Sequence, residues 1–138
     1  MNPMVSYAGR RKILVVDDEV SIADTLALIL STRGYELKVA YSAEGAIETL
    51  SEWSPDLAIM DVMLPQMNGI DLAIVIKSNY PGCRIILFSG QPDTSRLLDE
   101  AQKKGHRFDI LAKPIHPGFI LDTVSDMFST GAEPLADA

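Results

Sequence analysis

The chain has 138 residues, of which 47% are hydrophobic and 22% are charged. This length and composition are ordinary for one soluble globular domain with its own core. The formal net charge of −7 disfavours direct binding of nucleic acid or of an anionic membrane, because phosphate contacts require Lys and Arg. No apolar run approaches the roughly 20 residues that span a bilayer, and residues 1–10 lack the apolar core of a signal peptide.

The cysteine and histidine content narrows the chemistry further. Cys83 is the single cysteine, so an internal disulfide is impossible and a cytoplasmic location is the simplest expectation. The two histidines are too few for a typical zinc cage. Residues 1–10 and 131–138 are expected to be tails on either side of a single domain at residues 11–130.

The first part of the chain reads as strand, helix, strand. An apolar run predicts a strand at residues 12–16, and apolar residues at helical spacing predict a helix at residues 21–32. Ser21 with Asp24 is typical of the capping box that begins a helix. The strand expected at residues 36–40 carries charged side chains, which favours a sheet edge.

The middle of the chain repeats this alternation. Ser42 is expected to cap a helix whose apolar face includes Ile47. The apolar strand at residues 57–60 reads as buried on both faces. A helix at residues 68–79 and a strand at residues 84–88 follow.

The last part supplies two more helices and one more strand. Helices are expected at residues 92–104 and 117–129, with a strand between them at residues 108–112. Pro117 suits the first turn of the last helix. Phe119 is expected on the apolar stripe of that helix.

Five alternating strand–helix units predict a doubly wound α/β fold with a parallel sheet and right-handed crossovers. At this size we expect the flavodoxin-like strand order 2-1-3-4-5, counted along the chain. The first and third strands are then neighbours at the point where the order reverses. Asp17, Asp18 and Asp61, which end these two strands, would face one another across the crevice.

Charged side chains thus follow three of the predicted strands. Asp17 and Asp18 end the first strand, Asp61 ends the third and Lys113 ends the fifth. Three carboxylates repel one another strongly when clustered, and one lysine offsets only one charge. A divalent cation such as Mg²⁺ would neutralise the rest. The sequence therefore predicts a divalent-cation site around a reactive aspartate.

Each of these residues also has a simpler explanation. Asp17 and Asp18 could cap a helix, Asp61 could be an ordinary loop carboxylate, and Lys113 could lie on the surface. Ser89 could merely close a turn after its strand. Their shared place at the ends of strands favours a common site over four separate explanations.

Beyond these patterns, the chain resembles the receiver domain of two-component response regulators over about residues 11–129. No single motif carries the resemblance, but all of them stand in order at the ends of predicted strands. The matching segments are Val15-Val16-Asp17-Asp18-Glu19, Asp61-Val62-Met63-Leu64-Pro65-Gln66-Met67-Asn68-Gly69, Ser89-Gly90 and Lys113-Pro114.

The resemblance implies that Asp61 accepts a phosphoryl group from the phosphohistidine of a sensor histidine kinase or phosphotransfer protein. It implies that Mg²⁺ is held by Asp17, Asp18, Asp61 and the backbone carbonyl of Met63. By the same likeness, the chain is a signalling domain that catalyses only its own phosphorylation and dephosphorylation.

The resemblance also assigns roles at the last two strands. Ser89 would hydrogen-bond the phosphoryl group and Lys113 would pair with it, and a cis bond would precede Pro114. Many receivers carry an aromatic residue where this chain has Ile110. Switching through a swinging ring is therefore in question: switching would be weaker, or it would run through the loop after residues 84–88 alone.

Output is expected at the face formed by residues 92–104, 108–112 and 117–129. A downstream protein would dock there, and the domain would be a monomer or a weak dimer without direct nucleic-acid contacts. Candidate contact residues are Leu97, Lys104, Phe108 and Phe119.

Three other functions remain open at this point. A receiver-like interaction module would work without phosphorylation, and Ile110 is the one feature in its favour. A Mg²⁺-dependent phosphatase usually has a second carboxylate two residues after the nucleophile, where this chain has Met63. A flavin-binding flavodoxin requires a phosphate-cradling loop, whereas the loop after Val16 is acidic.

Overall fold

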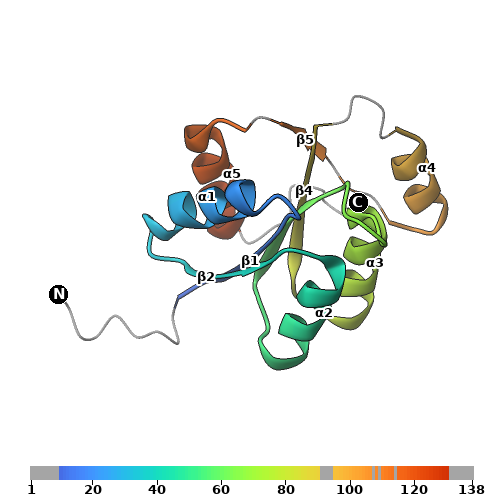
Figure 1. Cartoon of the computed structure of the whole chain (residues 1–138), viewed down its shortest axis with the longest axis horizontal. Coiled ribbons are helices and arrows are strands. Elements are labelled where there is room, and N and C mark those ends of the chain that lie inside the picture. Colours follow the sequence, from blue (N-terminus) through green and yellow to red (C-terminus); the bar gives the residue numbers. More distant parts are fainter. Residues whose placement is uncertain (1–9, 91–94, 107, 109, 114, 131–138) are drawn as a thin grey trace.

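Five parallel strands form one sheet in the order β2-β1-β3-β4-β5 (Figure 1), which confirms the predicted topology. The structure is a computed structural model that describes residues 10–90, 95–106, 108, 110–113 and 115–130. The strands are β1 (Lys12–Val16), β2 (Glu36–Ala40), β3 (Leu57–Asp61), β4 (Arg84–Ser89) and β5 (Ile110–Ala112).

Helices cover both faces of the sheet, as parallel strands require. Figure 1 shows α1 and α5 on one face and α2, α3 and α4 on the other. Among the described residues, no helix is both long enough and apolar enough to cross a membrane. The helices are α1 (Val20–Ser31), α2 (Ala43–Glu52), α3 (Gly69–Asn79), α4 (Ser95–Lys103) and α5 (Pro117–Thr130).

The sheet divides the core into two layers, because successive side chains of a strand point to opposite faces. Leu14 and Val16 of β1 pack toward α2, α3 and α4, whereas Ile13 and Val15 pack toward α1 and α5. Every residue of β3 is buried. The two central strands are thus fixed on both faces, and their carboxyl ends hold whatever follows them in a defined place.

The start of α1 differs from the prediction. The helix begins at Val20 with Glu19 as its N-cap residue, and the Glu19 carbonyl accepts hydrogen bonds from the N–H groups of Ile22 and Ala23. The capping box predicted at Ser21 and Asp24 is therefore wrong. The Asp24 carboxylate instead accepts a hydrogen bond of 2.7 Å from the Tyr41 hydroxyl.

Two apolar residues expected in the core lie at the surface. Ile47 of α2 is 41% exposed and Phe119 of α5 is 53% exposed. Both helices bury a narrower stripe than their sequence offers, because only the part facing the sheet is covered. The cap expected at Ser42 is confirmed by its acceptance of the Gly45 N–H at 2.9 Å, and Pro117 is the first residue of α5.

The second half also shows smaller changes in element ends. The fourth helix was expected from residue 92, but residues 92–94 lie outside the described part of the chain and α4 is seen from Ser95. β5 begins at Ile110, so Phe108 lies outside the strand. The bond expected to be cis involves Pro114, which is also outside the described residues.

Two charged side chains of the edge strand β2 contact Trp53 at the end of α2. Lys38 is exposed on this strand, and its Nζ lies 5.3 Å from the centre of the Trp53 ring. Trp53 donates a hydrogen bond of 3.2 Å from its Nε1 to Glu36. Charged residues on β2 thus fit its position at the sheet edge.

Candidate functional site

The candidate site lies at the carboxyl ends of β1 and β3, where the strand order reverses. These strands are paired in register, with Val16 opposite Met60. Asp17 directly follows β1 and Asp61 is the last residue of β3. The connection after β1 leads to α1 on one face and the connection after β3 leads to α3 on the other. Open α/β sheets bind their ligands in the crevice that this divergence creates.

Three carboxylates meet in this crevice, as the sequence predicts. Asp17, Asp18 and Asp61 each offer an oxygen within 4.8 Å of the others. Asp17 is 0% exposed and Asp61 is 4% exposed, whereas Asp18 is exposed. Hard carboxylate oxygens of this kind, with one side open to solvent, fit a divalent cation such as Mg²⁺. The cluster can therefore hold a metal ion.

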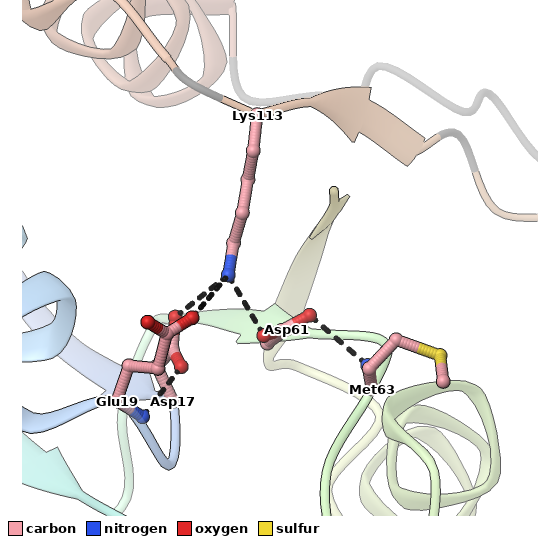
Figure 2. A network of polar contacts seen from close by, with 5 residues as sticks. All are labelled: Asp17, Glu19, Asp61, Met63 and Lys113. Carbon is pink, nitrogen blue, oxygen red and sulfur yellow. Dashed lines mark hydrogen bonds and ion pairs between the residues drawn. The ribbon is translucent and has the colours of Figure 1, made fainter. Parts of the chain in front are cut away.

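Lys113 reaches across from the end of β5 to join the carboxylates (Figure 2). Its Nζ lies 2.9 Å from Oδ2 of Asp61 and 3.2 Å from Oδ2 of Asp17. A longer contact of 3.8 Å joins it to Oε1 of Glu19. The Nζ also lies 5.0 Å from the centre of the Phe88 ring. One ammonium group thus links residues delivered by three separate strands.

A backbone hydrogen bond fixes the start of this lysine side chain, which also borders a cavity. Its N–H donates a hydrogen bond of 3.0 Å to the Ser89 carbonyl, which ties the end of β5 to the end of β4. Lys113 also borders a cavity of about 510 Å³ between α1 and the segment leading into α5. This cavity is lined by Ser21, Ile22, Thr25, Leu26, Ile29, Phe88, Lys113, Ile115 and Pro117.

The pocket shifts the ionisation of its members in a consistent way. Burial raises the pKa of Asp17, and the charge of Asp61 raises it further against the opposing effects of the Glu19 N–H and Lys113. Burial alone would lower the pKa of Lys113, but its bonds and charge interactions with Asp61 and Asp17 raise the net value. Lys113 therefore stays an ammonium ion at neutral pH. The carboxylates remain under-compensated, which favours an added cation.

The loop between β3 and α3 fixes the Asp61 side chain. The Met63 N–H donates a hydrogen bond of 3.0 Å to Oδ1 of Asp61 (Figure 2), which leaves Oδ2 to Lys113. Gly69 closes the loop with a hydrogen bond of 2.7 Å from its N–H to the Val62 carbonyl. A Cβ at Gly69 would overlap the Asp61 carbonyl oxygen and lie 2.9 Å from Val62 Cα. This close approach explains why glycine stands there.

Ser89 lies at the same edge of the sheet. It is the last residue of β4, which pairs with β3 on one side and β5 on the other. Its side chain is buried, with 4% exposure for the residue. The structure therefore brings Ser89 to the rim that carries Asp61 and Lys113.

Glu19 was not singled out from the sequence, although it contacts Lys113. It is 62% exposed at its side chain. Its N–H donates a hydrogen bond of 2.9 Å to Oδ1 of Asp17. The signal available in the sequence was the run of three acids that ends at Glu19. Spacing alone does not reveal that the third acid turns toward a lysine near the other end of the chain.

Known proteins similar in sequence agree on one family. A family model described as the response regulator receiver domain matches residues 13–125. The chain is 38% identical over 108 residues to the DNA-binding response regulator MtrA of Mycolicibacterium smegmatis. It is 33% identical over 108 residues to MtrA of Mycobacterium tuberculosis H37Rv. These matches cover 78% of this chain but 46% of each relative, so the chain spans about half their length.

These relatives are DNA-binding regulators, so the comparison gives no support to the expected absence of nucleic-acid binding.

Solved structures similar in fold point the same way. The signal receiver domain of an HD domain-containing protein from Pseudomonas fluorescens Pf-5 matches with a TM-score of 0.79 and 32% identity, over 88% of this chain and 96% of that one. A CheY-like receiver domain protein from Methanospirillum hungatei JF-1 also has a TM-score of 0.79, over 88% of this chain and 96% of that one, and at 24% identity it shows the fold alone. With the acidic pocket in the position described above, the chain belongs to the family of response regulator receiver domains, the signalling domains of two-component systems.

Proposed function

We propose that this chain is the phosphoacceptor domain of a two-component pathway and that Asp61 is the residue phosphorylated. The donor is the phosphohistidine of a sensor histidine kinase or phosphotransfer protein. The observation that supports this most is the bridge from Lys113 Nζ to both Asp61 and Asp17 in a crevice of three carboxylates. An isolated structural ion pair would not require three acids around one ammonium.

Mg²⁺ is the cofactor that suits this charge arrangement. Asp17, Asp18, Asp61 and the backbone carbonyl of Met63 would hold it. Three carboxylates and one ammonium leave two negative charges, which a divalent cation neutralises. When bound, the ion supplies positive charge beside the oxygens of the transferring phosphoryl group.

The chain's own residues supply the nucleophile and the remaining stabilisation. A carboxylate oxygen of Asp61 attacks the phosphorus, the P–N bond to the donor imidazole breaks, and its electron pair stays on that nitrogen. Lys113 and Ser89 provide donors for the equatorial oxygens, where positioned charge is most effective. Attack of water on the acyl phosphate then returns the Asp61 carboxylate and inorganic phosphate. Catalysis is thus confined to the domain's own modification.

The signal would leave through the face formed by α4, β5 and α5. New bonds at the phosphoryl group would draw on Ser89 and shift the connection that follows β4. Phe119, which is 53% exposed on α5, suits a contact with a downstream protein. We place the receiver domain at residues 11–130, in the cytoplasm, as a monomer or weak dimer. The other proposed contacts are Leu97, Lys104 and Phe108.

The direct test is incubation with Mg²⁺ and acetyl phosphate, followed by intact mass measurement. We expect one phosphoryl adduct that is stable in acid, labile in base and absent from Asp61→Asn. Asp122→Asn removes an exposed carboxylate of α5 and should retain the adduct. An unmodified wild-type protein with every donor would contradict the proposal and favour an interaction module. Rapid turnover of unrelated phosphoesters would favour a phosphatase.

A further inference from the structure

Arginine side chains gather at the opposite end of the sheet, far from the acidic pocket. Arg11 precedes β1, Arg33 lies in the turn between α1 and β2, and Arg84 begins β4. Two of them flank Phe128 in the last turns of α5. The distance from Cζ to the ring centre is 5.0 Å for Arg11 and 5.7 Å for Arg84. The Tyr35 ring lies 5.6 Å from the same ring.

The strand pattern explains this gathering. Arg11, Tyr35 and Arg84 each stand two residues before an apolar residue that packs toward α1 and α5. Because side chains alternate along strands, the three point to the same face as those residues. The apolar residues are Ile13, Leu37 and Ile86.

Arg33 belongs to the same cluster. Burial raises the pKa of Tyr35, and the charges of Arg33 and Arg11 oppose this rise. Both guanidinium groups therefore lie close enough to the phenol to act on it. We call Arg11, Arg33 and Arg84, with Tyr35 and Phe128, the arginine cluster.

Within the described part of the chain, no carboxylate forms an ion pair with these three arginines. The nearby acids at this end are engaged elsewhere. Asp56 accepts the Lys12 N–H at 2.8 Å, and Glu36 accepts the Trp53 Nε1–H at 3.2 Å. Arg11 and Arg33 are exposed and Arg84 is half-buried. Three positive charges thus lie at this end without an ion-pair partner among the described residues, although the whole chain carries a net charge of −7.

We propose that the arginine cluster is a docking site for a short acidic peptide segment of a partner protein. Guanidinium groups bind carboxylates in bidentate fashion, and Tyr35 and Phe128 offer an apolar base beside them. Arg and aromatic residues together are typical of interface hot spots. Because the Phe128 ring already holds the guanidinium groups of Arg11 and Arg84, less side-chain freedom is lost on binding. This inference does not depend on phosphorylation of Asp61.

Charge elsewhere on the molecule favours a short segment over an extended polyanion. Duplex DNA or an anionic membrane would bring many phosphates toward a chain whose net charge is −7. At physiological ionic strength, salt screens charge interactions beyond about 8 Å. A short acidic segment at the arginine cluster is therefore hardly repelled by the carboxylates of the acidic pocket. A peptide with a few carboxylates contacts only the arginine cluster and not the acidic parts of the surface.

The test uses a fluorescein-labelled hexaglutamate peptide and anisotropy at physiological ionic strength. We expect wild-type protein to bind it, with affinity falling at least about tenfold in Arg11→Gln/Arg84→Gln and further with Arg33→Gln added. Arg96→Gln removes the same group from an exposed position on α4 and should bind like wild type. The affinity of the conservative Arg11→Lys/Arg84→Lys variant should lie between those of wild type and the double glutamine variant. It keeps both positive charges but loses the paired guanidinium donors that bind a carboxylate in bidentate fashion.

Several outcomes would overturn the proposal. These are no binding of hexaglutamate, an equal loss in Arg96→Gln, full binding in the triple variant, or a clear preference for duplex DNA or phosphatidylserine vesicles. Urea denaturation and the acetyl phosphate adduct report whether each variant is folded. Asp61→Asn should lose the adduct and keep peptide binding, so failure of one proposal is distinguishable from failure of the other.

Discussion

The two ends of the parallel sheet carry opposite charge and are built differently. At the carboxyl ends, two of the three carboxylates are buried and their positions are fixed by Lys113 and backbone N–H groups. At the amino ends, Arg11 and Arg84 lie over the ring of Phe128, and two of the three arginines are exposed. Buried charges are costly and hold a defined geometry, which suits chemistry. Exposed charges cost little and suit recognition.

The largest effect is expected when the lysine at the carboxyl ends of the strands is removed. Lys113→Gln should slow formation of the Asp61 adduct from acetyl phosphate by about 10²–10³-fold, because one charged donor to the phosphoryl oxygens is lost. Mg²⁺ should bind more tightly, since the carboxylates lose their only close cation in the described structure. Mass kinetics and Mg²⁺ titration measure the two effects.

Arg84→Gln is the control for that variant at the other end of the sheet. It removes a cation of the arginine cluster and should leave the adduct rate unchanged. A similar slowing in both variants would show that the two ends do not act separately.

The next largest effect is a change in the free energy of unfolding when a glycine at either end of the sheet is replaced. Gly69→Ala should lower the free energy of unfolding by about 3 kcal/mol, because its methyl group would collide with the Asp61 backbone. Gly82→Ala, in the turn before β4, meets no atom within 4 Å and should be nearly neutral. Urea denaturation compares them. Equal stability of the two variants would mean that the loop after Asp61 adapts freely.

At Asp17 we expect a smaller change in the free energy of unfolding, and in the opposite direction to that of Gly69→Ala. Asp17→Asn should raise the free energy of unfolding of metal-free protein at neutral pH by about 1 kcal/mol, since a buried charge is removed and repulsion from Asp61 is relieved while part of the Lys113 contact is lost. Arg33→Gln, at an exposed site of the other end, should change it by less than about 0.5 kcal/mol. The same Asp17 variant should weaken Mg²⁺ binding, so stability and function diverge at this residue.

The pH dependence follows from the same residue. The native pKa of Asp17 is raised above its ordinary value of 3.8, so the native state binds more protons than the unfolded state between those two values. The free energy of unfolding of metal-free protein should therefore fall as pH rises through that window. Denaturation in EDTA at several pH values should show this fall in wild type and lose it in Asp17→Asn. Parallel curves for the two proteins would contradict the assignment.

The smallest effect is expected at Glu19, whose side chain is 62% exposed and 3.8 Å from Lys113. Exposed ion pairs contribute about 0–1 kcal/mol. Glu19→Gln should therefore leave stability nearly unchanged and alter Mg²⁺ affinity by no more than a few fold. A change as large as that of Asp17→Asn would place Glu19 among the metal ligands.

The fold and the meeting of the acids were predictable because both follow from local patterns. Apolar runs mark strands buried on both faces, and the carboxyl ends of parallel strands all lie at the same end of the sheet. Asp17, Asp18, Asp61 and Lys113 could thus be brought together before any coordinates were known. The strand order also places residues at the amino ends of the strands, but Arg11, Arg33 and Arg84 are far apart in the sequence and form no motif there.

What the sequence did not predict depends on distant partners. Asp24 was expected to help begin α1, but its carboxylate is taken by Tyr41, which lies 17 residues away. Glu19 begins the helix through its backbone and turns its side chain to Lys113. Ile47 and Phe119 belong to the apolar stripes of their helices but are exposed, because the surface that covers each helix is narrower than the stripe. Helical periodicity predicts the stripe and not the width of that surface.

The protected edges of the sheet have a consequence for self-association. β2, at one edge, carries the exposed Lys38, and β5, at the other, has three residues. Neither edge is a favourable template for an added strand, because charge and short length discourage edge-to-edge pairing. Concentrated protein should therefore resist fibril formation, and contacts between side chains are favoured over extension of the sheet when this domain forms complexes.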